Sequence, residues 1–217
     1  MIDLGKKPVL SLTKGQPLSL TKAAGRRLSR VAIGLAWDPA PSLLGWFGGG
    51  SVDLDASCIC LDGRGQVVDQ VWFNQLHSRE RAIHHSGDNR TGDGGGDDET
   101  IRVNLEALDP RIAALVFTIT SYTGQTFDRL AGSTCRVYEG EQVLAQYALP
   151  GKGSHTALVV AGLRRQGDDW EAEALGIPAN GRVVHDLVDQ ASRGMGPWTA
   201  QSHRGYTGPA INDRRQP

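Results

Sequence analysis

The segment Gly87–Glu99, with the sequence GDNRTGDGGGDDE, carries the densest chemistry in the chain. One arginine stands among five acids, so the segment has a net charge of −4. Its glycines allow tight turns, and a hard cation that takes about six to eight oxygen ligands would relieve the repulsion between the carboxylates. Magnesium prefers retained waters, and zinc or copper would seek His or Cys, which the segment lacks. Calcium is therefore the expected ligand. The acids are Asp88, Asp93, Asp97, Asp98 and Glu99.

Other segments offer further oxygens. Asp53 and Asp55 are two apart at the start of a predicted strand, so they share a face, and Asp38 ends another strand. The acids divide into one group drawing on Asp38, Asp53 and Asp55 and another drawing on the end of the acidic segment, which predicts about two calcium ions. A solvated acidic loop without a cation is the alternative, and the spacing does not fit an EF-hand.

Composition excludes several functions. Twenty-three basic and 24 acidic residues give a net charge of −1, so no electrostatic field favours nucleic acid. Three cysteines without metal-site or disulfide spacing suit a reducing compartment. The chain shows no secretory signal and no apolar run of membrane-spanning length. We expect a soluble, cytoplasmic protein.

Short apolar runs bounded by Gly, Pro, Asp and Asn predict an all-β fold, a two-sheet β-sandwich with one or two short helices. A helix is expected over 182–193 and one or two turns over 124–130. The near-copies at Leu10 and Leu18 suggest two short adjacent strands. We expect one domain over 1–193 and a flexible tail over 194–217. The predicted strands are 28–37, 53–61, 66–73, 100–105, 114–122, 133–139, 142–149, 155–163 and 170–175.

Several motifs resemble the TerD-type tellurium resistance and general stress proteins. They are GLAWDP, DLDAS, FNQ and HSGDNRTGDGGGDDETIRVNL, in matching order, and the resemblance covers roughly 7–190. It implies a two-sheet sandwich that binds two calcium ions and belongs to bacterial operons for resistance to tellurite, phage, colicins and chemical damage. The metal residues carried over by motif are Asp38, Asp53, Asp55, Asp88, Asn89, Asp97, Asp98 and Glu99, with a backbone carbonyl at Gly92.

The chain also departs from the family pattern. GLAWDP replaces the commoner GLGWD, a longer apolar run occupies 42–52, and ITSYTGQTFDRLAG stands where many members have a TIHEA-like segment. The last departure leaves the specificity for partners open. In the 42–52 run, the apolar cluster at 43–47 either folds over the sandwich or contacts a partner or membrane surface.

The preferred function is a calcium-binding sensor or scaffold that works with other proteins of a stress-resistance complex and is not an enzyme. No histidine sits in a recognisable catalytic pattern, and we expect His84 and His85 to have structural or indirect roles beside the acidic segment. Cys58 and Cys60 are expected as core residues. Two alternatives remain, namely a thiol- or metal-dependent tellurite-detoxifying enzyme and a structural protein that calcium only stabilises.

Overall fold

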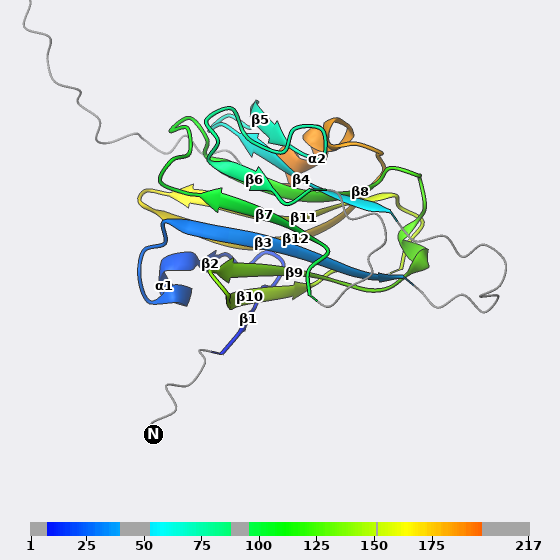
Figure 1. Ribbon diagram of the computed structural model, residues 1–217, viewed down its shortest axis with the longest axis horizontal. Helices are drawn as coiled ribbons and strands as arrows, with labels where there is room; N and C mark the ends of the chain where they lie inside the picture. Colours follow the sequence, from blue (N-terminus) through cyan, green and yellow to red (C-terminus); the bar gives the residue numbers. More distant parts are fainter. Residues whose placement is uncertain (1–7, 40–52, 88–95, 151, 197–217) are drawn as a thin grey trace, which may run out of the picture.

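The computed structural model describes residues 8–39, 53–87, 96–150 and 152–196 (Figure 1). Within these residues the strands form two six-stranded sheets, which confirms the predicted β-sandwich. The first sheet has the order β1 (Leu10–Ser11), β10 (Gln142–Ala148), β9 (Leu130–Glu139), β3 (Arg30–Pro39), β7 (Glu99–Asn104) and β6 (Ile83–His85). The second has the order β2 (Leu18–Ser19), β12 (Asp169–Ala179), β11 (Ala157–Gln166), β8 (Ala114–Ser121), β4 (Leu54–Leu61) and β5 (Val67–Val71).

All nine predicted strands have counterparts in the sheets, and two features of the edges differ from expectation. β1 and β2 do not pair with each other, because β1 pairs parallel with β10 in the first sheet and β2 pairs antiparallel with β12 in the second. β6 was not predicted, since it has three residues and two of them are histidines. It pairs with β7 at the edge of the first sheet.

Alternation along the strands creates two cores. The inward side chains of both sheets form the larger one, to which β4 contributes Leu54, Ala56, Cys58 and Cys60. The other face of β4 contributes Ile59 and Leu61 to a second core on the outer face of the second sheet. The 3-10 helix η2 (Val184–Leu187) and the helix α2 (Val188–Gly194) cover that face. They match the helix expected over 182–193.

The remaining helical segments are short. The turn expected over 124–130 is the 3-10 helix η1 (Phe127–Arg129), whereas α1 (Leu20–Ala24) was not predicted. Met195, just after α2, is buried in the second core. The rest of the expected tail, 197–217, lies outside the described residues. No helix in the described part of the chain has the length and apolar character needed to span a bilayer.

Asp169, at the start of β12, fixes the N-terminal segment to the second sheet. Its carboxylate accepts hydrogen bonds from the hydroxyls of Ser19 at 2.6 Å and Thr21 at 2.7 Å, and from the Thr21 backbone N–H. Burial raises the pKa of Asp169, but the hydrogen bonds from these groups outweigh burial and hold the pKa below its ordinary value. The ionised carboxylate therefore stabilises the position of α1.

Candidate functional site

Two buried side chains of the first sheet reach across the sandwich to the backbone of β4. Glu99 begins β7, and its Oε2 accepts a hydrogen bond from the Ala56 N–H at 2.7 Å. His85 ends β6, and its Nε2 lies 3.0 Å from the Ala56 carbonyl oxygen. Since β5 pairs with β4 only from Cys58 onward, these side chains occupy positions that a neighbouring strand would otherwise fill. They tie the two sheets together at the end where the acidic segment begins.

The ring of His85 also holds the entrance to that segment. Its Nδ1 accepts a hydrogen bond from the Gly87 N–H at 3.0 Å, so Nε2 carries the proton and donates to the Ala56 carbonyl. The same Nε2 lies 3.3 Å from Glu99 Oε2, and both side chains are fully buried. The structure thus gives His85 a structural role beside the acidic segment. His84 points to the other face of β6 and is partly exposed.

Asp98 extends the pairing between β3 and β7. Its backbone N–H donates to the Leu35 carbonyl at 2.8 Å, and its carboxylate accepts from the Trp37 N–H at 2.8 Å. Burial raises the pKa of Asp98 most; the Trp37 hydrogen bond lowers it, and the charges of Asp38, Asp97 and Glu99 raise it further. The net shift is upward. The carboxylate is held by the fold in a negative environment, which a bound cation would stabilise.

Asp97 lies on the outer face of the first sheet above Gly34. Its Oδ1 accepts a hydrogen bond from Arg136 Nη1 on β9 at 2.5 Å. Burial and a hydrogen bond to Asp97 raise the pKa of Tyr138, also on β9, to about 12. A methyl group at Gly34 would collide with the Asp97 carboxylate and lie 2.8 Å from Tyr138 Cε2, so the close approach depends on glycine. The protein itself already compensates the charge of Asp97.

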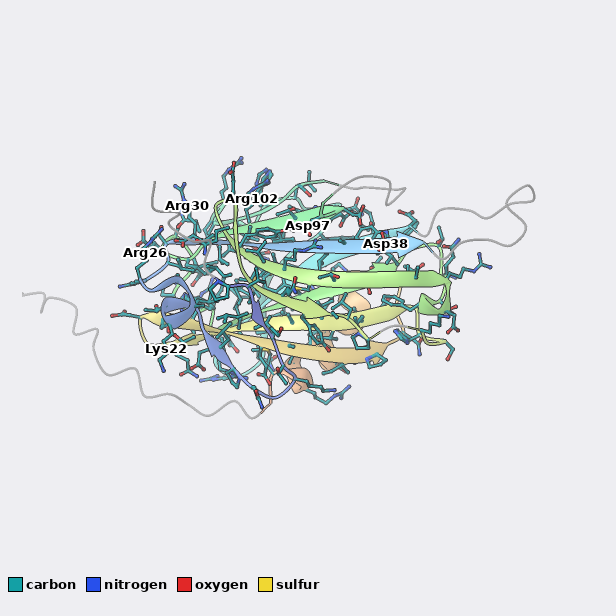
Figure 2. All side chains as sticks on the ribbon, turned by 90° about the horizontal axis from the view of Figure 1, so that it is seen from below. Lys22, Arg26, Arg30, Asp38, Asp97 and Arg102 are labelled. Carbon is teal, nitrogen blue, oxygen red and sulfur yellow. The ribbon has the colours of Figure 1, made fainter. Side chains whose placement is uncertain are left out.

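Asp38 is exposed on the same outer face, towards the end of β3 (Figure 2). It stands opposite Gly132 on β9, where a side chain would approach its Oδ2 at 3.6 Å. Its charge contributes to the raised pKa of Asp98. The structure therefore places Asp38 close enough to Asp98 to influence its pKa, whereas the sequence had suggested a group of Asp38, Asp53 and Asp55.

Asp55 is buried. It lies on the outer face of the second sheet, because its neighbour Ala56 points into the larger core. It is opposite Thr120 on β8, and Ser57 is opposite Thr118. Both threonine hydroxyls are buried and make no hydrogen bond within the described part of the chain. Sequence reasoning missed these two oxygens, although threonines two apart in the apolar strand ALVFTITS give a recognisable signal. Asp53 precedes β4, and its Oδ1 is also buried.

Not all of the expected ligands can be placed. Asp88, Asn89, Gly92 and Asp93 lie outside the described residues, as does the apolar cluster at 43–47. Among the residues that are described, no three His, Cys, Asp or Glu side chains converge as a complete metal site. Of the placed acids, Asp38, Asp97, Asp98 and Glu99 belong to the group at the first sheet, and Asp53 and Asp55 belong to the group at the second. Both groups offer oxygen ligands, which are the donors that calcium takes.

The thiols offer little reactivity. Cys58, Cys60 and Cys135 are free and fully buried. A hydrogen bond that the Cys60 thiol donates to Cys58, together with burial, raises the pKa of Cys60 well above its usual value, and burial raises the pKa of Cys135 to about 12. Thiolates are the reactive form of cysteine, so the raised pKa values of Cys60 and Cys135 make these two thiols poor nucleophiles and poor ligands for soft ions.

Comparison with known families covers most of the chain. Residues 9–190 match the TerD domain. The chain belongs to the TerD family. Over 185 residues it is 43% identical to tellurium resistance protein TerZ of Serratia marcescens, with 82% of this chain and 95% of that protein covered. It is 34% identical to stress response protein SCP2 of Bacillus subtilis over 197 residues, covering 83% and 98% of the two chains.

The fold also matches a solved TerD-family structure. The crystal structure of a homologue of telluride resistance protein (TerD) from Streptomyces coelicolor A3(2) superposes with a TM-score of 0.59 at 25% identity. The match covers 74% of this chain and 95% of that one. These relatives are named as resistance or stress proteins, so this TerD-family chain is a member of a tellurium-resistance and stress-response family.

Proposed function

We propose that this TerD-family protein binds about two calcium ions and acts as a sensor or scaffold in a stress-resistance system, without catalytic turnover. The observation that carries the proposal is the gathering of acids around Asp98, whose pKa is raised first by burial and then by the charges of Asp38, Asp97 and Glu99. Carboxylates held this close together in a folded protein repel one another, and a divalent cation would remove that repulsion.

The donor chemistry of the placed residues fits calcium. Asp38 and Asp98 would hold one ion at the end of the first sheet, and Asp53 and Asp55 would hold the other at the second sheet. His85 makes its hydrogen bonds to the protein backbone. The cysteines are in the core. Calcium would supply charge neutralisation and crosslink the loops, while the residues themselves keep the carboxylates in place.

Paired substitutions test this division. Asp98→Asn and Asp55→Asn each remove one charge from a different group, so each variant should lose one calcium site and keep the other. Asp168→Asn is the matched control, because the Asp168 side chain is 92% exposed. Calorimetric titration of metal-stripped protein measures the stoichiometry. If both variants bind calcium as the control does, the ligand assignment is wrong.

The two alternatives are separated by different measurements. A purely structural role for calcium predicts a higher melting temperature but the same affinity for protein partners in calcium and in chelator, whereas a sensor predicts calcium-dependent capture of its partners. A thiol-based detoxifying activity predicts consumption of tellurite by the purified protein. The burial and raised pKa of Cys60 favour neither turnover nor soft-ion binding.

A further inference from the structure

A hollow on the outer face of the first sheet lies away from Asp38 and the proposed calcium sites (Figure 2). It has a volume of about 380 Å³ and is lined by parts of β3, β6 and β7 and by the turn that joins β9 to β10. Ligand pockets in proteins commonly measure about 300–1,000 Å³, so this hollow has room for a small organic molecule. The lining residues are Arg30, Val31, Ala32, Ala82, His84, Arg102, Val103, Asn104 and Gly140.

Strand register explains how the hollow forms. Val31 and Val103 point into the core, so Arg30, Ala32, Arg102 and Asn104 point outward. Arg30 is opposite Asn104, and Ala32 is opposite Arg102. The two arginines are therefore diagonal neighbours, about 7–8 Å apart at the backbone, a separation from which both guanidinium groups reach one anion. Ala32 leaves the space between them open, since its side chain is only a methyl group.

The hollow is positively charged. Its lining, as far as the described residues go, contains two arginines and a histidine but no Asp or Glu. Neither Arg30 nor Arg102 is within ion-pair distance of an acid among the residues that the structure describes. Glu139, which precedes Gly140, is instead ion paired with Arg26. Figure 2 places Arg26, Arg30 and Arg102 towards one end of the molecule and Asp38 towards the other.

The pKa of His84 is consistent with a positive electrostatic potential in the hollow. His84, on β6, is paired with Arg102 on β7, and the centroids of the His84 and His77 rings lie 4.5 Å apart. Burial lowers the pKa of His84, and electrostatic interactions with His77 and Arg102 lower it further. An anion bound in the hollow would reduce the electrostatic cost of protonating His84.

We propose that this hollow binds a small organic phosphate, with the phosphoryl group between Arg30 and Arg102. Two guanidinium groups that have no acidic partner among the described residues match the charge and the oxygen geometry of a phosphate, and Asn104 adds a further donor. Inorganic phosphate alone would leave most of the volume empty. The organic part of the ligand would lie over Ala32 and Ala82.

The test is a calorimetric titration of the full chain with adenosine 5′-monophosphate, inorganic phosphate and adenosine. We expect the monophosphate to bind most tightly, inorganic phosphate more weakly, and adenosine not to bind at all. The double variant Arg30→Gln/Arg102→Gln should weaken monophosphate binding about tenfold or more, because hydrogen bonds to charged groups are lost. Ala32→Leu should also weaken binding by filling the hollow while both arginines remain.

The control Arg129→Gln/Arg193→Gln removes the same charge from two exposed positions on η1 and α2 and should bind as the wild type does. Circular dichroism and melting curves check that each variant folds. Absence of binding by both phosphates would overturn the proposal, as would an equal loss in the control. Binding to vesicles with anionic lipids but not to the monophosphate would show that a lipid headgroup, and no small soluble phosphate, occupies the hollow.

Discussion

His85 is the residue whose replacement should reveal how the two sheets are held together. Replacing it with alanine removes the donor to the Ala56 carbonyl and the acceptor for the Gly87 N–H. Ala56 is fully buried, so its carbonyl would lose a partner that water cannot replace, at a cost of about 1–3 kcal/mol. Gly87 is half-buried and loses less. Removing a fully buried ring adds a cavity, which brings the expected loss of unfolding free energy to about 3–5 kcal/mol.

Two further variants make the measurement specific. His84→Ala changes the adjacent, partly exposed residue and should alter the unfolding free energy by about 0.5 kcal/mol or less. His85→Gln keeps an amide donor near the Ala56 carbonyl and should lose less than His85→Ala does. Guanidinium denaturation followed by tryptophan fluorescence, in chelator, gives the free energies without any contribution from bound calcium. Equal losses for His84→Ala and His85→Ala would refute the role assigned to His85.

Three other changes give clear expectations. Asp169→Asn should lower the unfolding free energy by about 1–2 kcal/mol at neutral pH. Because the pKa of Asp169 is depressed in the folded protein, the extra stability of the wild type should be lost as the pH falls through that pKa. Urea denaturation of both proteins at several pH values measures this. Replacing Cys58 and Cys60 with alanine should lower the melting temperature but leave the calcium affinity unchanged, and loss of tellurite protection in a folded double variant would instead support the thiol mechanism. Gly34→Ala should displace Asp97 and cost about 1–3 kcal/mol, measured by the same denaturation assay, and an unchanged stability would contradict the close packing there.

The sequence predicts those parts of the molecule that depend on local pattern. Strands such as β4 and β8 show their alternation or apolar runs directly, and the inward positions of Cys58 and Cys60 follow from a period of two. The family, the sandwich and the helical segment made of η2 and α2 also follow from the sequence. The acidic segment and its neighbouring aspartates indicate oxygen ligands by residue type alone.

Contacts between distant segments could not be predicted from the sequence. Arg136 lies 39 residues from Asp97, and nothing in the local sequence shows that these two residues meet on one face of the sheet. The link from His85 to Ala56 joins different sheets, so it depends on how the sheets pack and not on either strand. The same is true of β1 and β2, whose similar sequences suggested pairing although each joins a different sheet.

Calcium binding itself is tested most directly by calorimetric titration of the metal-stripped wild-type chain. We predict saturable binding of about two calcium ions per chain, with binding abolished by excess chelator. The same titration with magnesium should give much weaker binding, because magnesium retains its waters. No heat of binding, or a calcium stoichiometry well below one in folded protein, would contradict the proposed function.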